Sequence, residues 1–440
     1  MQTRFYELAD HLAKRLEGDE VFLATFSGEE SDFVRFNRSA VRQAGSVRQA
    51  YVTLDLISGR KHAKCTFTAS GEPQLDTRRA VEALEELRHR LPNVPEDPYL
   101  LYSTEVRSGG TLGQNRLPDS GQTVQAVLKA GVGRDLVGIY AAGGIFSGFA
   151  NSLGQRNWYS THSFHLDWSF HLRADKAVKS SYAGFQWDAS EFDRKVALAA
   201  EQLAILDRPP KTIPRGHYRV YLAPAAMEDF VGILAWGGFG LKAHRTKTTP
   251  LLKMVEEGAR LHPSITICEN TREGIAPNFQ SAGFIKPDTV TLIEAGRYSQ
   301  CLVCPRSAKE YGVATNGAGG GEAPESLDVA GGDIPAADVL SRLGEGVYVS
   351  QLHYLNYSDR PACRITGMTR FATFWIEGGK IAAPLNVMRF DETVYRALGE
   401  NLVGLTGERD FIPNPGTYGG RNTASGRVPG ALVENFAFTL

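Results

Sequence analysis

The feature that most limits the fold of this chain is an alternation of apolar and polar side chains within residues 157–172. Successive side chains of an extended strand point to opposite faces, so the alternation predicts a strand with one apolar and one polar face. The apolar face would carry Phe164, Leu166, Trp168 and Phe170. The polar face would carry His165, Asp167, Ser169 and His171. We therefore expect a half-buried strand whose polar side faces solvent, a loop or a ligand.

Other segments show a mixture of strand and helix patterns. Residues 47–69 alternate on both sides of a turn sequence at 58–61, which predicts a hairpin. Apolar residues recur at helical spacing in residues 1–16 and 77–91, and a third helix is expected to begin at Ser190, whose hydroxyl can cap its first turn. No regular βαβ rhythm is visible. The pattern favours an α+β fold with largely antiparallel sheets.

A proline-rich segment divides the chain. Residues 207–216 hold three prolines and a glycine, which resist helix and sheet alike. We therefore predict an N-terminal α/β domain at 1–206, a linker at 207–216 and a β-rich C-terminal domain at 217–440. The chain has 46 glycines, more than the usual share of roughly 7%. This excess predicts many tight turns between short strands.

Charge and cysteine content narrow the function classes. Lys and Arg number 48 against 49 Asp and Glu, so no basic face is available for nucleic acid or an anionic membrane. The first residues do not resemble a signal peptide, and the five cysteines do not resemble a secreted disulfide framework. We expect a cytoplasmic protein that binds neither nucleic acid nor membrane.

Two motifs are expected to be structural rather than functional. Cys301 and Cys304 could share a soft metal or form a redox pair, but no second cysteine pair exists and the segment does not read as a helix start, so buried cysteines are expected. The glycine-rich loop at 316–332 lacks the spacing of a phosphate-binding loop, and a flexible loop is expected. Its first residue, Asn316, is a candidate contact for a bound peptide.

The polar face around His165 is the third candidate. Two imidazoles and a carboxylate could bind a metal or supply acid and base groups near neutral pH. However, His165 and His171 would lie roughly 20 Å apart along a strand, too far to share one ion. His162 is closer to His165 but points to the opposite side. The alternative is a half-buried strand whose polar side contacts loops or solvent.

Several long strings resemble the TldD/PmbA family, once called modulators of DNA gyrase. They are DFVRFNRSAVRQAG at 32–45, GIYAAGGIFSGFANSLGQRNW at 138–158, EYGVATNGAGGGEAPESLDVAGG at 310–332 and ITGMTRFATFWIEGGKIAAPLNVMRF at 365–390. The resemblance covers nearly the whole chain. It implies an N-terminal α/β portion, a β-rich C-terminal portion and a role in cytosolic peptide proteolysis or maturation.

The resemblance also implies a zinc site in one type of subunit. TldD-type subunits carry a helical His-Glu-x-x-x-His and a later cysteine in a Gly-Thr-Cys-Gly segment, and they pair with PmbA-type (TldE) subunits that lack these ligands. Two imidazoles one helical turn apart and a thiolate can hold zinc, while the glutamate takes a proton from the attacking water.

This chain departs from that pattern at each ligand. Within AAMEDFVGILAWGGFG, Glu228 and Asp229 fall near the His-Glu positions and Ile233 or a neighbour replaces the second histidine. In NPGTYGG, Tyr418 stands in place of the cysteine. A hydrocarbon side chain cannot ligate zinc, so no metal or other cofactor is expected in this chain. Zinc is expected in a TldD-type partner instead.

The sequence therefore predicts a PmbA-type, non-catalytic subunit that pairs with a TldD-type zinc subunit or with itself. An extended peptide would contact His165, Asp167, His171 or Asn316, gripped through its backbone. One alternative is an autonomous metal-dependent peptidase with a displaced site built from His162, His165, Asp167 or Glu228. Another is a standalone peptide-binding homodimer.

Overall fold

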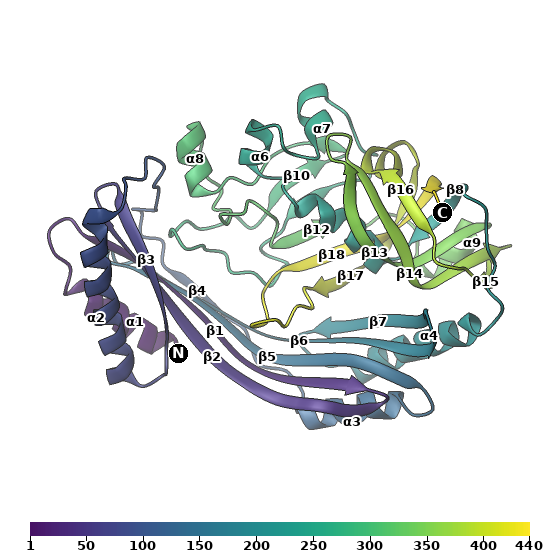
Figure 1. Cartoon of the computed structure of the whole chain (residues 1–440), viewed down its shortest axis with the longest axis horizontal. Helices are drawn as coiled ribbons and strands as arrows, with labels where there is room; N and C mark the ends of the chain where they lie inside the picture. The colour runs from purple at the N-terminus through teal and green to yellow at the C-terminus, as the bar shows by residue number, and fades with distance from the viewer.

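The computed structural model describes residues 1–440 and contains two separate β-sheets flanked by helices (Figure 1). The N-terminal elements are α1 (Gln2–Ala13), β1 (Val21–Asn37), β2 (Ala40–Ser58), β3 (Lys61–Thr68), α2 (Pro73–Arg90), η1 (Leu91–Asn93), β4 (Gly109–Leu112), α3 (Ser120–Ala130), β5 (Asp135–Asn151), β6 (Arg156–Arg173), β7 (Lys176–Gly184) and α4 (Ala189–Leu206). The strand order of their sheet is β3-β2-β1-β5-β6-β4, and β7 also pairs with β6. All pairs are antiparallel except β4 with β6. The hairpin predicted at 47–69 is confirmed by the pairing of β2 with β3.

The prediction of short strands between tight turns is wrong for this sheet. Strands β1, β2, β5 and β6 each span 17 to 19 residues and curve together across the molecule (Figure 1). Several glycines lie inside β5 because neighbouring strands approach too closely for a side chain. A Cβ at Gly143, where φ is 150°, would lie 2.0 Å from the Glu30 carbonyl oxygen, and one at Gly138 would lie 2.6 Å from that of Asp167.

Two helical layers cover this sheet. Helices α1 and α2 lie side by side and share a core with β1 and β2, in which Leu12, Leu54 and Leu84 are fully buried (Figure 1). Helix α4 covers the apolar face of β6, where Phe192 contacts Trp168 with ring centroids 5.8 Å apart. Ser190 does not cap α4 as predicted. Asp188 is the N-cap, because its Oδ1 accepts hydrogen bonds from the backbone N–H groups of Ser190 and Glu191.

The C-terminal part is β-rich. Its elements are β8 (Gly216–Leu222), α5 (Pro224–Gly232), η2 (Ile233–Ala235), α6 (Leu241–Arg245), α7 (Leu252–Glu257), β9 (Ile267–Glu269), β10 (Val290–Glu294), β11 (Arg297–Tyr298), α8 (Pro305–Tyr311), β12 (Ser326–Val329), η3 (Ala336–Asp338), α9 (Val339–Leu343), β13 (Gly346–Asp359), β14 (Arg364–Glu377), β15 (Lys380–Pro384), β16 (Arg389–Thr393), η4 (Arg396–Glu400), β17 (Leu402–Pro413) and β18 (Ser425–Phe438). The main strand order is β11-β10-β9-β12-β18-β16-β14-β13-β8, and β18 also pairs with β8. Strands β8, β13, β14, β16 and β18 therefore close on themselves. The predicted α+β fold with a β-rich C-terminal part is confirmed.

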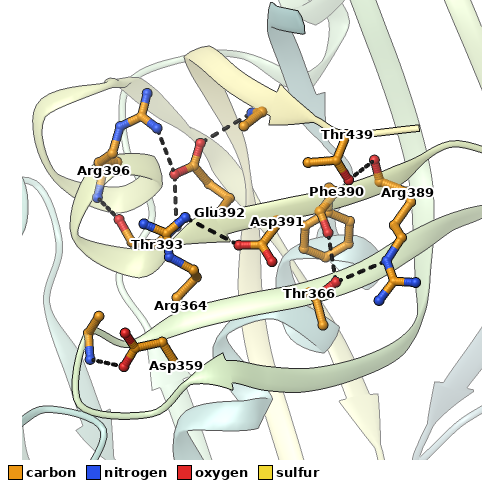
Figure 2. A network of polar contacts seen from close by, with 12 residues as sticks. Asp359, Arg364, Thr366, Arg389, Phe390, Asp391, Glu392, Thr393, Arg396 and Thr439 are labelled. Atoms are coloured by element: carbon orange, nitrogen blue, oxygen red, sulfur yellow. Dashed lines mark hydrogen bonds and ion pairs between the residues drawn. The ribbon is translucent and has the colours of Figure 1, made fainter. Parts of the chain in front are cut away.

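A polar network reinforces the weakest seam of that closed ring (Figure 2). Strands β16 and β18 pair only through Phe390 and Phe438. Beside them, the buried carboxylate of Glu392 accepts a hydrogen bond from the Ala437 N–H at 3.2 Å and lies 3.3 Å from the Arg396 guanidinium. Burial raises the pKa of Glu392, and these partners oppose the shift. Side-chain contacts therefore hold the C-terminal strand where backbone pairing is sparse.

The two parts of the chain share a hydrophobic cluster. Phe164 and Leu166 of β6 belong to the same buried cluster as Tyr221, Phe374 and Leu432 of the C-terminal sheet. A larger cluster fills the C-terminal part alone, where α5 packs on β13 and β18. None of the helices combines the length and apolar character that a membrane crossing requires. The division into domains at 207–216 stays a prediction, because the shared cluster joins the parts on either side.

We predict that Asp188→Ala lowers the free energy of unfolding by about 1 kcal/mol, because the first N–H groups of α4 lose their acceptor. Ser190→Ala is the matched control and should cost less, since the hydroxyl itself bonds to Asp188. Urea denaturation of both variants measures the difference. A larger loss for Ser190→Ala would restore Ser190 as the cap.

Candidate functional site

A cavity of about 490 Å³ lies between the two sheets. Strands β6 and β7 form one wall, helix α5 and strand β13 form another, and the segment that joins β17 to β18 borders it. Its polar lining includes four residues predicted from the sequence: His165, Asp167, Glu228 and Asp229. Residues more than sixty positions apart in the chain thus meet around one space.

Helix α5 turns its two acids toward the cavity because its other face is buried. Ala226, Met227 and Phe230 are 0% exposed and pack into the C-terminal core, so the intervening Glu228 and Asp229 point the other way. An Oδ2 atom of Asp229 accepts a hydrogen bond from the Leu352 N–H at 3.1 Å. This bond ties α5 to β13 and leaves Glu228 as the acid with the freer carboxyl group.

Both acids have raised pKa values. Burial first, and the nearby Asp229 second, raise the pKa of Glu228 to about 7, although the charge of Lys179 opposes the shift. Burial also raises the pKa of Asp229 to about 6, although its bond to Leu352 and the charge of Lys179 lower it. Near neutral pH, Glu228 is therefore about half ionised, which suits either proton transfer or binding of a cation.

The period of β6 places His165 and Asp167 on the cavity side, as predicted. Asp167 has a partner: its Oδ2 lies 3.5 Å from the Lys179 Nζ on β7. His165 is 5% exposed, and its Nε2 has no hydrogen-bond partner. Burial and, secondarily, the charge of Arg421 lower the pKa of His165 to about 4, so the ring is neutral at physiological pH.

The other predicted peptide contacts lie elsewhere. His171 is exposed and pairs with Asp135 and Ala177 near the end of β6. The Asn316 amide is engaged by the segment before α8, because its Oδ1 accepts from the Val303 N–H at 2.9 Å and its Nδ2 donates to the Cys301 carbonyl at 2.8 Å. Neither residue lines the cavity.

His162, which belongs to the alternative hydrolase site, also lies outside the cavity lining. Its Nδ1 is 3.2 Å from the Gly113 carbonyl oxygen, and its ring meets Phe146 edge-on. Of the residues of that alternative, only His165, Asp167 and Glu228 meet around one space.

A second hollow of about 350 Å³ adjoins the cavity at Glu228 and Asp229, which line both. Trp236 and Tyr354 line the second hollow and are 57% and 77% exposed. Exposed aromatic side chains beside buried acids offer apolar contact next to charge. The two hollows share these acids in their linings, and together they are called the groove.

The residues present do not fit a zinc site. Ile233 is 4% exposed and belongs to the C-terminal core, so the second histidine position is filled by hydrocarbon. Tyr418 is fully exposed in the segment between β17 and β18 and does not line the cavity. No group of three or more His, Cys, Asp and Glu side chains gathers anywhere in the chain in a way that could hold a metal ion. No chemical step is therefore assigned to a metal in this chain.

The crossover loop, residues 414–424, is a feature that sequence reasoning missed. Its Arg421 guanidinium contacts adjacent strands of the N-terminal sheet and donates to the Ser163 Oγ at 2.7 Å and to the Gly143 carbonyl at 3.2 Å. The Arg421 N–H donates to the buried Glu29 carboxylate at 3.2 Å. Burial lowers the pKa of Arg421 to about 10, so it stays charged. The loop is thus anchored to the opposite sheet at the cavity edge.

The cysteine motif is placed differently from the expectation. Cys304 does stand at a helix start: it is the N-cap of α8, and its Sγ accepts from the Ser307 N–H at 3.5 Å. It is 4% exposed, whereas Cys301 is half-buried and burial raises the pKa of its thiol. The prediction that the cysteine pair lies away from any helix start is therefore wrong. Pro305 is the first residue of α8, and proline is common at that position of a helix.

Comparisons with known proteins agree with the strings noted in the sequence. A family model described as PmbA/TldA metallopeptidase C-terminal domain matches residues 215–440, just over half of the chain. No curated protein matches the chain in sequence. Similar solved structures include TldE from Thermococcus kodakarensis, with a TM-score of 0.79 and 15% identity over 99% of this chain and 100% of that one.

Two further structures are similar over 99% of this chain. A protein from Thermotoga maritima described as a modulator of a DNA gyrase has a TM-score of 0.78 and 16% identity over 100% of its length. A protein from Bacteroides thetaiotaomicron with a similar description has a TM-score of 0.76 and 13% identity over 98% of its length. At these identities the likeness shows a shared fold.

We predict that Arg421→Met lowers the free energy of unfolding by about 2 kcal/mol, because Ser163 and Gly143 lose a charged donor inside the protein. It should also raise the pKa of His165 toward its ordinary value, since the charge of Arg421 contributes to the depression. Denaturation and an NMR titration measure the two effects. Arg42→Met, at an exposed arginine of β2, is the control. Equal stability of both variants would show that the loop needs no anchor.

Proposed function

Because the chain belongs to the TldD/PmbA family, we propose that it is a PmbA (TldE) type of subunit, a non-catalytic peptide-binding partner of a TldD-type zinc peptidase. The observation that carries this proposal is a polar cavity in a chain that lacks the zinc ligands of the TldD-type subunit. The cavity retains a polar lining, while Ile233 and Tyr418 leave no ligand set for zinc. The fold likeness to TldE of Thermococcus kodakarensis supports the choice of subunit type.

The shape of the groove supports binding of an extended peptide. Its two hollows of about 490 and 350 Å³ share Glu228 and Asp229 in their linings, which makes a longer binding space than either alone. Gln351 and His165 line the larger hollow, and the Oε1 of Gln351 and the Nε2 of His165 are buried without a hydrogen-bond partner. A peptide backbone carries regularly spaced N–H and C=O groups that can satisfy such atoms.

The catalytic water would be activated in the partner. In this chain Asp229 is held by Leu352 and Asp167 by Lys179, so both acids serve to shape the groove. The TldD-type subunit would supply zinc and its bound water, and the assembly would act in peptide proteolysis or maturation in the cytoplasm. Self-association into a peptide-binding homodimer is the form expected when no such partner is present.

A second candidate is an autonomous hydrolase. It is favoured by one observation: His165, Asp167 and Glu228 line the same cavity, and Glu228 has a pKa of about 7. A carboxyl group with this pKa can act as a general base near neutral pH. This candidate requires that the isolated chain cleaves peptides by itself, which separates it from the first.

We predict that the chain purified without chelator contains far less than one zinc per chain and does not hydrolyse unfolded peptide. Mixed with a TldD-type subunit from the same organism, it should co-elute and increase the peptidase activity above that of the TldD-type subunit alone. Metal analysis by mass spectrometry, size-exclusion chromatography and a peptidase assay measure these outcomes.

The control for that experiment is a TldD-type subunit with its two motif histidines changed to alanine. The mixture should then assemble but stay inactive, because the zinc site lies in the partner. One zinc per isolated chain, or peptide hydrolysis without the partner, would favour the autonomous hydrolase. Neither co-elution nor a change in activity would reject the subunit role.

A further inference from the structure

The groove contains a carboxyl group with no counterion. Asp167 is paired with Lys179, whose Nζ lies 3.5 Å from its Oδ2, and Asp229 accepts from the Leu352 N–H. Glu228 lies between them with no cation within ion-pair distance, and its carboxyl oxygens are open to the cavity. A half-buried acid without a partner is costly to ionise unless a ligand supplies the positive charge.

Two more polar atoms beside the groove have no hydrogen-bond partner. His165 is 5% exposed, lines the cavity, and has an Nε2 atom without a hydrogen bond. Gln351 on β13 lines the opposite wall, and its buried Oε1 atom is also unpaired. Buried polar atoms are nearly always satisfied in native proteins, so these two indicate a bound group that is absent from the free chain. A neutral imidazole offers one acceptor nitrogen, and an amide oxygen is an acceptor.

One kind of ligand could donate hydrogen bonds to all of these acceptors. An ammonium group carries three N–H donors, a positive charge and no acceptor. We propose that the groove binds the ammonium group of a peptide, from a lysine side chain or an N-terminus, at Glu228, with His165 and Gln351 accepting from neighbouring N–H groups of the peptide. This inference rests on the proposed function, because it names which peptides the groove prefers.

The exposed aromatic residues extend the same site. Trp236 and Tyr354 line the hollow on the other side of Glu228, at 57% and 77% exposure. Aromatic faces attract cations and cover the methylene stem of a lysine side chain. The junction of the two hollows thus combines a carboxylate with apolar surface, as a long cationic side chain requires.

The affinity for a cationic peptide should depend on pH through the ionisation of Glu228. The charged and titratable groups that face the junction come from each packed element: Asp229 on α5, Lys179 on β7, His165 and Asp167 on β6, and His353 on β13. Burial first, and Asp229 second, raise the pKa of Glu228 to about 7. An ammonium ligand binds the ionised form, so binding below pH 7 must release a proton. Affinity for a lysine peptide should therefore rise from pH 6 to pH 8. Affinity for a free N-terminus should rise from pH 6 to pH 7 and then level off, because an α-amino group loses its proton with a pKa of roughly 7.7 to 8.0.

The test uses fluorescently labelled hexapeptides of one sequence that differ at a single position and at the N-terminus. Two have a blocked N-terminus and carry either lysine or norleucine, a third carries norleucine with a free N-terminus, and a fourth is blocked and carries glutamate. Fluorescence anisotropy at pH 6, 7 and 8 measures binding to the wild-type chain, to Glu228→Gln and to Glu345→Gln. Glu345 is exposed and outside the groove, so it is the matched control.

We expect the wild-type chain to bind the blocked lysine peptide or the free N-terminus peptide about ten-fold more tightly than the blocked norleucine peptide at pH 8. The peptide that shows the preference identifies the source of the ammonium group. Glu228→Gln should remove the preference while still binding the norleucine peptide, and Glu345→Gln should keep it. Glutamine has the shape of glutamate and removes an unpaired buried charge, so the variant should fold.

Three outcomes would overturn the inference. Equal binding of all peptides would reject the ammonium site and leave the proposed peptide-binding function intact. A preference that persists in Glu228→Gln, or that does not fall toward pH 6, would place the cation elsewhere. No binding of any peptide would reject both the inference and the peptide-binding function on which it rests.

Discussion

The two-residue period of β6 is the constraint on which the rest of the structure depends. Because the strand is extended, Phe164, Leu166 and Trp168 must share one face, and burying them under α4 turns His165 and Asp167 toward the C-terminal part. A shift of one residue in the pairing of β6 with β5 would exchange the faces and place an imidazole and a carboxylate in the hydrophobic core. The register of one strand therefore fixes the core and the cavity at once.

The cavity follows from how the C-terminal part closes against that polar face. Helix α5 buries an apolar stripe in its own core and presents Glu228 and Asp229 to the opposite wall. The two walls then carry acids that face one another across a space, with Lys179 as the counterion of Asp167. Such an arrangement disfavours a tightly packed interface and keeps the space open, because a carboxylate such as that of Glu228, which has no counterion, resists removal from solvent.

Much of the local structure could be predicted from the sequence. Periodicity identified the polar face of β6, the hairpin of β2 with β3, and the apolar side of α2, because each depends on residues close together in the chain. The family could also be identified, because long strings carry it. The cap of α4 was misplaced from Asp188 to Ser190, since both residue types can cap and only the backbone geometry distinguishes them.

The rest could not be predicted because it depends on contacts between distant segments. Nothing local in Gly-Gly-Arg marks Arg421 as a group that donates hydrogen bonds to strands of the opposite sheet. The meeting of His165 with Glu228 likewise depends on how two sheets pack, and periodicity carries no information about that packing. His171 shares the face of His165 by the same period, yet lies beyond the region that the C-terminal part covers.

The contact of Arg421 with Glu29 joins residues 392 positions apart in the chain. Contacts of such high sequence separation form late, because a long loop must close before they yield any stabilisation. During synthesis the N-terminal sheet emerges long before the crossover loop that anchors to it. One wall of the cavity comes from residues 165–183 and the others from residues 225–426, so neither half of the chain alone contains the site. A chain whose synthesis stops between the walls would therefore leave no partly working groove that could capture peptides.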